Sequence, residues 1–191
     1  LLIIISFILN FFLIKIAYKF NYLDYPTSRK PHEKPTPFTG GFVLVIFFVL
    51  FAIFFFQNNE IKLILFSSAL VGFLGLLDDK FNLNPALKTF FLVLISFYVT
   101  LNDLRISTLG SYNFLGDLYL GNFSIIFSLL CILFLTNAFN YNDGIDGLTI
   151  FTFWTSSFLI MTISKNNDVN TLLIYANIIL LVLFFFNMSI F

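Results

Sequence analysis

The chain has few charged residues, one cysteine and one histidine. Asp, Glu, Lys and Arg make up 10% of its 191 residues, against about 25% in soluble domains, so a soluble domain is excluded. The formal net charge is zero, which suggests no nucleic-acid partner. Cys131 lies inside an apolar run, so a disulfide framework is excluded and a buried, inert thiol is expected.

Apolar residues are abundant instead: 59% of the chain is hydrophobic, and Phe alone occurs 30 times. A helix needs about 20 mostly apolar residues to cross a bilayer. The runs predict an all-α, polytopic transmembrane helical bundle that forms a single integral-membrane domain over residues 1–191. The expected spans number about seven: 1–18, 40–56, 61–77, 88–101, 123–139, 148–164 and 169–187.

The two ends of the sequence also carry information. No basic segment precedes the first run and no small-residue cleavage site follows it, so the run is interpreted as a span and not as a signal peptide. The chain begins with Leu1 and stops at Phe191, directly after an apolar run. We therefore expect a piece of a longer protein.

Three polar clusters separate the apolar runs, and alternation of the spans places all three on one side of the membrane. They are Asp24–Gly41, Gly75–Lys88 and Asn137–Leu148. Seven basic residues flank or occupy that side (Lys15, Lys19, Arg29, Lys30, Lys34, Lys80 and Lys88), against three on the other (Lys62, Arg105 and Lys165). This asymmetry predicts that the clusters face the cytoplasm. Residues 102–122, rich in glycine and alternating in polarity, predict a small periplasmic hairpin.

The first cluster combines prolines with cationic side chains. Its four prolines fix φ and remove backbone donors, which predicts a stiff loop and not a helix. Arg29, Lys30 and Lys34, with His32, could hold phosphates. For each cation taken singly, an ordinary cytoplasmic loop rich in basic residues is an equal alternative.

The second cluster contains Asp78 and Asp79 at the end of a span. Adjacent carboxylates near lipid need a partner, and they point in different directions on a helix. One could act as a base while the other orients a metal or a lysine. A solvated helix end is the alternative. Lys88 begins the next span and could reach a phosphate at the interface.

The third cluster is rich in amides and carboxylates. Asn137 and Asn140 are three residues apart, as are Asp143 and Asp146, so each pair shares a face if its segment is helical. Such oxygens suit Mg²⁺, or the hydroxyls of a sugar or base. The alternative is a plain glycine-rich turn. Taken together, the three clusters favour Mg²⁺-assisted phosphoryl transfer to a lipid-borne acceptor.

The clusters resemble the motifs of a known family. Asp24–Gly41 resembles the D-x-P-x-x-R-K-x-H-x-x-P-x-P-x-x-G-G loop of the polyprenyl-phosphate N-acetylhexosamine-1-phosphate transferases, Asp78–Lys88 is similar to their D-D-x-x-x-L-x-P-x-x-K stretch, and Asn137–Leu148 to their N-A-x-N-x-x-D-G-x-D-G-L turn. The resemblance implies transfer of a sugar 1-phosphate from a UDP-N-acetylhexosamine to undecaprenyl phosphate, with release of UMP. It implies Mg²⁺, with Mn²⁺ as an alternative, the bacterial cytoplasmic membrane, and by analogy a homodimer.

The resemblance also implies roles for individual residues. Asp78, Asp79, Asp143 and Asp146 would be catalytic, with Asp79 and Asp143 as metal ligands; Lys30, His32 and Lys88 would contact phosphates, and Asn137 and Asn140 would line the pocket. The family's further Gly-Asp-x-Gly motif, whose Asp is a metal ligand, is expected beyond Phe191. Two catalytic routes stay open: direct attack by the lipid phosphate, or a covalent phosphosugar intermediate on an Asp.

Three other functions compete with this one. The residues of the three clusters favour the N-acetylglucosamine branch of the family, but a phospho-N-acetylmuramoyl-pentapeptide transferase of peptidoglycan synthesis is an alternative. An ion-coupled transporter would carry its carboxylates in the middle of spans, whereas here they lie at span ends and in loops. An inactive membrane scaffold is the third alternative, and the intact clusters argue against it.

Overall fold

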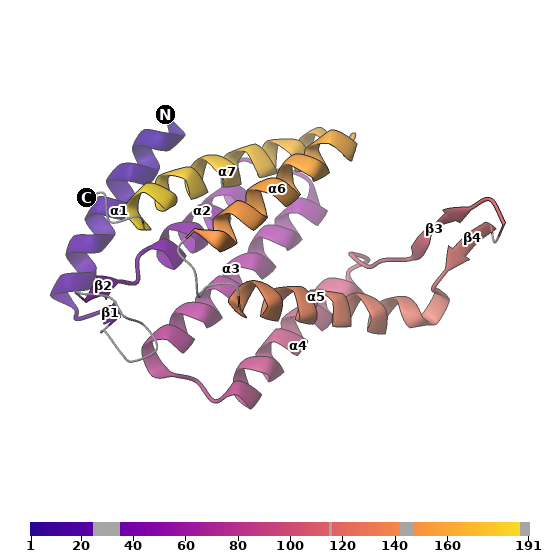
Figure 1. Ribbon diagram of the computed structural model, residues 1–191, viewed down its shortest axis with the longest axis horizontal. Helices are drawn as coiled ribbons and strands as arrows, with labels where there is room; N and C mark the ends of the chain where they lie inside the picture. The colour runs from indigo at the N-terminus through magenta and orange to yellow at the C-terminus, as the bar shows by residue number, and fades with distance from the viewer. Residues whose placement is uncertain (25–34, 115, 142–146, 188–191) are drawn as a thin grey trace. The chain divides into compact units, whose positions relative to one another are not determined.

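The computed structural model describes residues 1–24, 35–114, 116–141 and 147–187 (Figure 1). Each predicted apolar run is helical, which confirms the all-α polytopic fold. The helices are α1 (Leu2–Lys19), α2 (Gly40–Phe54), α3 (Asn59–Phe81), α4 (Pro85–Leu101), α5 (Ser124–Tyr141), α6 (Leu148–Ile163) and α7 (Asn167–Asn187). Short strands are β1 (Leu23–Asp24), β2 (Thr36–Pro37), β3 (Thr108–Tyr112) and β4 (Gly116–Tyr119), with a 3-10 turn at Gly121–Phe123.

Four helical segments of the described chain are long and apolar enough to cross a membrane by length and composition. They are Leu2–Lys19, Asn59–Phe81, Gly121–Asn140 and Asn167–Phe186. The apolar helices α2, α4 and α6 are shorter, with 15, 17 and 16 residues. Large apolar side chains are exposed along the helices, including Phe12, Leu70 and Leu159. In water such a surface would drive aggregation, whereas lipid tails solvate it.

Asparagine side chains cap the N-termini of several helices. The Oδ1 of Asn58 accepts the Glu60 N–H at 2.8 Å, and that of Asn84 accepts the Ala86 N–H at 2.9 Å. Asn166 caps α7 in the same way, through the Asp168 N–H at 2.9 Å. These caps satisfy donors that a helix start leaves without an internal partner. They explain why α3 and α4 begin earlier than the apolar runs 61–77 and 88–101.

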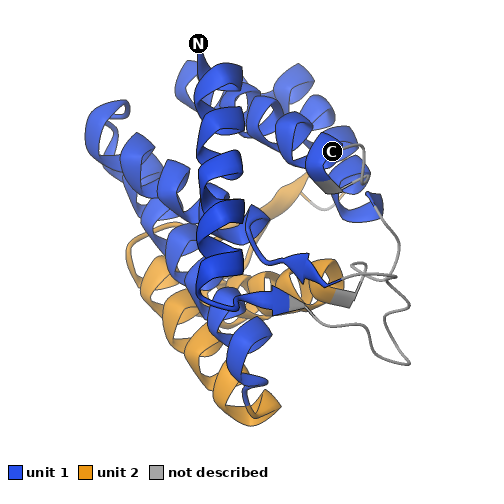
Figure 2. Cartoon of the chain, turned by 90° about the vertical axis from the view of Figure 1, so that its left-hand side faces the viewer, with its two compact units in different colours: residues 1–83, 143–191 blue, residues 84–142 orange. Residues whose placement is uncertain are grey.

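The described residues form two compact units (Figure 2). Unit 1 comprises Leu1–Leu83 and Asp143–Phe191, and unit 2 comprises Asn84–Asn142. A single domain over the whole chain stays a prediction.

Unit 1 is built around the packing of α2 on α3, with α1 and α6 packed on α7. Its core is apolar and aromatic, and includes Val43, Phe47, Phe51, Ile61, Leu65 and Ile179. A polar link joins α6 to α7, where the Ser157 hydroxyl donates to the Asn177 Oδ1 at 3.0 Å. Both groups are hydrogen-bonded, which removes the penalty of placing them between apolar helices.

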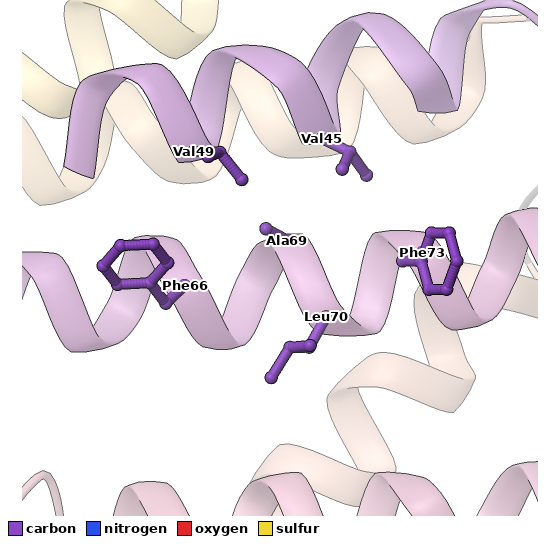
Figure 3. Close-up of a pocket in the computed structure, with 6 residues that line it drawn as sticks. All are labelled: Val45, Val49, Phe66, Ala69, Leu70 and Phe73. Atoms are coloured by element: carbon purple, nitrogen blue, oxygen red, sulfur yellow. The ribbon is translucent and has the colours of Figure 1, made fainter. Parts of the chain in front are cut away.

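The antiparallel helices α2 and α3 approach closely because glycines lie at their contact. A Cβ on Gly72 would lie 2.8 Å from the Val45 Cγ2, and one on Gly41 2.8 Å from the Leu76 Cδ2. Small residues are the usual means of close helix packing in membranes. Beside this contact runs a shallow apolar groove of about 290 Å³, lined by Val45, Val49, Phe66, Ala69, Leu70 and Phe73. Figure 3 shows the two valines of α2 opposite Ala69 of α3.

We expect Gly72→Ala to lower the free energy of unfolding in mixed micelles by about 1–3 kcal/mol, the usual effect of overpacking. The methyl group would clash with Val45, a β-branched side chain with little rotamer freedom. Gly75→Ala is the matched control on the same helix, because a Cβ there meets no atom within 4 Å. Equal stability of the two variants would show that α2 and α3 are not held at this distance.

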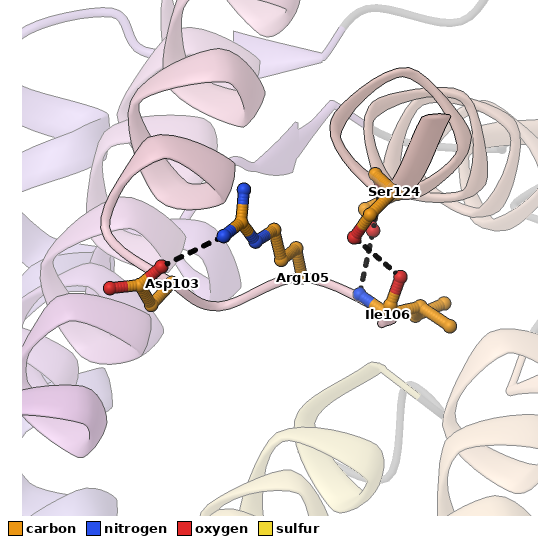
Figure 4. Close-up of polar contacts among 5 residues, drawn as sticks. Asp103, Arg105, Ile106 and Ser124 are labelled. Carbon is orange, nitrogen blue, oxygen red and sulfur yellow. Dashed lines mark hydrogen bonds and ion pairs between the residues drawn. The ribbon is translucent and has the colours of Figure 1, made fainter. Parts of the chain in front are cut away.

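Unit 2 pairs α4 with α5, joined by a hairpin. The strands β3 and β4 are antiparallel, with Ser111 opposite Asp117 and a bulge after Thr108, which confirms the hairpin predicted within 102–122. Its base is fixed to α5: the Ile106 N–H donates to the Ser128 Oγ at 2.7 Å, and the Ser124 hydroxyl donates to the Ile106 carbonyl at 2.6 Å (Figure 4).

Candidate active site

A sharp turn at the end of α1 places Tyr22. Asn21 adopts φ 54°, a left-handed conformation that Asn tolerates better than most residues. The Tyr22 N–H then donates to the Ala17 carbonyl at 2.8 Å, closing the end of the helix. The chain leaves α1 with the Tyr22 side chain beside the last part of α3.

The two ends of the first polar cluster are held together. Leu23 pairs with Pro37 and Asp24 with Thr36, as β1 and β2, and the Phe38 N–H donates to the Tyr22 carbonyl at 3.4 Å. We call these segments, 22–24 and 36–38, the neck. The predicted phosphate ligands Lys30 and His32 fall between these two segments in the sequence, and they lie outside the described residues.

Tyr22 joins the neck to α3. Its hydroxyl donates to the Leu76 carbonyl at 2.5 Å, and its ring makes edge contacts with Phe38 and Phe42 at centroid distances of 5.5 and 5.3 Å. Burial, and then the charge of Asp79, raise the pKa of the Tyr22 hydroxyl above its ordinary value. The phenol therefore stays neutral at physiological pH and remains a hydrogen-bond donor.

The acidic pair lies in the last turn of α3, beside the neck. Asp78 is half-buried, and its Oδ1 accepts the Leu83 N–H at 3.1 Å, while its carbonyl accepts the Asn82 N–H at 2.8 Å. Asn82 is left-handed, with φ 48°, and ends the helix. Asp79 follows one residue later, so it points in another direction, and it is exposed. Asp78 thus shapes the turn after α3, while Asp79 faces the surroundings.

Three predicted residues belong to unit 2. Lys88 is half-buried in the first turn of α4, where its N–H donates to the Asn84 carbonyl at 3.0 Å. Asn137 and Asn140 lie near the end of α5, three residues apart. The Asn137 Nδ2 donates to the Leu133 carbonyl at 2.9 Å, and Asn140 is exposed. The structure therefore places the two asparagines near the same end of one helix.

Asp143 and Asp146 lie outside the described residues, but the glycine that follows them is described. Gly147 precedes α6 with φ 79°, and a Cβ there would lie 2.8 Å from the Phe184 Cε2. Both the left-handed backbone and the contact with Phe184 favour glycine at this position. This gives a physical reason for the last glycine of the D-G-x-D-G-L turn.

A metal would find part of its ligand set in unit 1. Asp79 offers an exposed carboxylate, a hard oxygen ligand of the kind that Mg²⁺ prefers. In the described part of the chain, no three His, Cys, Asp or Glu side chains gather as a metal site. The other predicted ligand, Asp143, lies outside that part. The oxygen donor of Asp79 therefore suits Mg²⁺, but the described residues supply only part of the ligands that the ion needs.

The sequence did not reveal the contact between Tyr22 and Lys80. The Lys80 ammonium lies over the Tyr22 ring, 5.3 Å from its centroid, and 5.5 Å from that of Phe81. Tyr22 and Leu76 are 54 residues apart, so no local pattern reveals their hydrogen bond. The one available signal was the position of Lys80, directly after the paired aspartates.

Comparison with known proteins agrees with these motifs. A family profile described as "Glycosyl transferase family 4" matches residues 61–191. Proteins named undecaprenyl-phosphate alpha-N-acetylglucosaminyl 1-phosphate transferase are similar: the one from Yersinia pestis is 33% identical over 70% of this chain and 37% of its own length, and the one from Thermotoga maritima is 34% identical over 76% and 44%. No solved structure matches the chain.

The match therefore spans less than half the length of these relatives. The family profile nevertheless covers more than half of this chain, from the start of α3 onward, and takes in both the acidic pair and the Asn137–Leu148 turn. On this ground the chain belongs to glycosyl transferase family 4.

Proposed function

We propose that the protein transfers N-acetylglucosamine 1-phosphate from UDP-N-acetylglucosamine to undecaprenyl phosphate and releases UMP, as the first membrane step of a cell-envelope polysaccharide. One observation carries the proposal: an exposed Asp79 beside a half-buried Asp78, at the polar end of an apolar helix. The names of the relatives support the same substrates. The excess of basic residues near the clusters supports a site on the cytoplasmic face of the bacterial inner membrane.

The proposed reaction exchanges one phosphorus–oxygen bond for another. An oxygen of the lipid phosphate attacks the β-phosphorus of the UDP-sugar, and the bond to the bridging oxygen breaks, so that UMP leaves with that oxygen. A phosphate monoester loses its second proton at a pKa of about 6. The attacking oxygen is therefore already ionised at neutral pH, which favours direct attack over a covalent intermediate. Charge neutralisation and positioning are then the main tasks.

The predicted residues divide these tasks. Asp79, with Asp143, would hold Mg²⁺ or Mn²⁺, which when bound neutralises phosphate charge and orients the reacting groups. Asp78 would fix the turn that carries α3 into α4, and Asp146 would serve the nucleotide-sugar region. Lys30, His32 and Lys88 would bind phosphates, and Asn137 and Asn140 would hydrogen-bond to the sugar or base.

The test is UMP release by the protein expressed from its intact gene, in nanodiscs with undecaprenyl phosphate and Mg²⁺. A panel of UDP-sugars should give UMP with UDP-N-acetylglucosamine, and none when the lipid acceptor is omitted. Turnover of UDP-N-acetylmuramoyl-pentapeptide instead would assign the protein to peptidoglycan synthesis. A folded sample that turns over none of them would refute the proposal, and cation flux without a UDP-sugar would indicate a transporter.

A further inference from the structure

Lys80 is held by aromatic rings at the acidic end of α3. Its ammonium lies over the faces of Tyr22 and Phe81, and Tyr22 is itself fixed by its hydrogen bond to Leu76 and by its contact with Phe42. The Lys80 side chain is nevertheless exposed. The rings cover part of the ammonium group, so its remaining N–H donors are directed away from them. The two ring contacts therefore favour one orientation of this exposed cation.

The neighbouring charges show what such a cation could do. Asp78 and Asp79 immediately precede Lys80 and would repel any phosphate that approaches the end of α3. A cation beside them offsets that repulsion and offers charge-assisted hydrogen bonds to phosphate oxygens. The lysine also lies in the last turn of its helix, where a positive charge is favoured by the helix dipole.

We propose that Lys80 binds a phosphate group of a substrate beside the acidic pair, and that Tyr22 is a positioning residue that holds its ammonium there. This inference rests on the proposed function for the identity of the substrate. The phosphate belongs either to the polyprenyl acceptor or to the nucleotide sugar, and the same chemistry would recognise both. Neither Lys80 nor Tyr22 was among the residues that the family motifs indicated.

The experiment measures binding, which does not require turnover. The intact protein in zwitterionic nanodiscs is titrated with geranylgeranyl phosphate, with the uncharged alcohol geranylgeraniol, and with UDP-N-acetylglucosamine. The variants are Lys80→Met, Lys80→Arg, Tyr22→Phe and Tyr22→Leu. Lys62→Met is the matched control, because it removes one cation from the opposite end of the same helix. Thermal unfolding of each variant establishes that it is folded.

We expect Lys80→Met to lower the affinity for a phosphate-bearing ligand by about tenfold or more, the usual effect of losing a charge-assisted hydrogen bond. Lys80→Arg should retain most of the affinity, and binding of the alcohol should not change. A loss of affinity for geranylgeranyl phosphate alone would show that Lys80 binds the lipid acceptor. A loss of affinity for UDP-N-acetylglucosamine alone would show that it binds the donor. Unchanged affinity for both, or an equal loss in Lys62→Met, would overturn the proposal.

The tyrosine variants test the positioning role. Tyr22→Leu removes the ring from under the ammonium, so it should lower the affinity for the same ligand that Lys80→Met affects. Tyr22→Phe keeps the ring and should lower that affinity less. If Tyr22→Leu does not fold, the double variant Tyr22→Phe/Lys80→Met decides: an additional loss beyond Lys80→Met alone would show that Tyr22 acts apart from Lys80. Absence of UMP release by the unaltered protein would refute the proposed function and leave these binding results intact.

Discussion

Asp79→Asn should lower the rate of UMP release by about 10³-fold, within the range for loss of a group acting on the reacting centre. The substitution keeps the shape of the side chain and removes its charge, so it abolishes any metal ligation by the Asp79 carboxylate. Because Asp79 is exposed, we expect the variant to remain folded, with a change in the free energy of unfolding of about 1 kcal/mol or less. The measurement is steady-state UMP release at saturating UDP-N-acetylglucosamine, beside thermal unfolding of the same sample.

Two comparisons make this prediction specific. Asp103→Asn makes the same chemical change at an exposed carboxylate in the loop after α4, paired there with Arg105 at 3.3 Å, and should leave turnover unchanged. Asp78→Ala should reduce both turnover and stability, since it removes the acceptor of the Leu83 N–H. Turnover within tenfold of the original in a folded Asp79→Asn variant would remove Asp79 from the catalytic set.

Removal of divalent cations with EDTA should abolish measurable UMP release, and added Mg²⁺ should restore it. The proposed reaction would bring together a lipid phosphate, a diphosphate and the carboxylates of Asp78 and Asp79. We expect the mutual repulsion of these negative charges to need more positive charge than the lysine side chains supply. A divalent cation held by Asp79 and Asp143 would supply that charge, and we expect its removal to lower the rate by at least about three orders of magnitude.

The metal dependence can be tied to a residue. Mn²⁺ should replace Mg²⁺ at least in part, since both accept oxygen ligands in octahedral geometry. Asp79→Asn should also raise the Mg²⁺ concentration needed for half-maximal residual activity, whereas Asp103→Asn should not. Undiminished turnover in EDTA would refute the metal proposal while leaving the transfer reaction itself in place.

The apolar helices were predictable because lipid imposes one simple rule, a long apolar run with its backbone satisfied internally. The residues at which these helices begin and end were harder to predict. The span 61–77 was expected to stop before the acidic pair, yet α3 continues to Phe81, since Asp78 and the left-handed Asn82 close a further turn. The span 88–101 begins at Pro85, because Asn84 and the proline form a favourable helix start.

The candidate site was predictable in its composition and not in its contacts. The motifs named Asp78 and Asp79, but nothing local links them to Tyr22, which reaches α3 through a turn at Asn21. Lys80 was counted as a basic residue for orientation, and its place over an aromatic ring depends on that same long-range contact. Contacts of this kind depend on how distant helices pack, which the polarity pattern of a single segment does not encode.

The length of α3 has a consequence for how the proposed lipid substrate would reach the acidic pair. Its 23 residues extend over about 34 Å at 1.5 Å per residue, slightly more than the roughly 30 Å of a bilayer core. A helix of this length that crosses the bilayer core would carry its last turn, with Asp79, to the depth of the lipid headgroups. A polyprenyl phosphate could meet it by lateral diffusion, without leaving the membrane. The rate of the proposed reaction should thus follow the mole fraction of that lipid in the surface, and diluting it with inert phospholipid should slow turnover even when its bulk concentration is held constant.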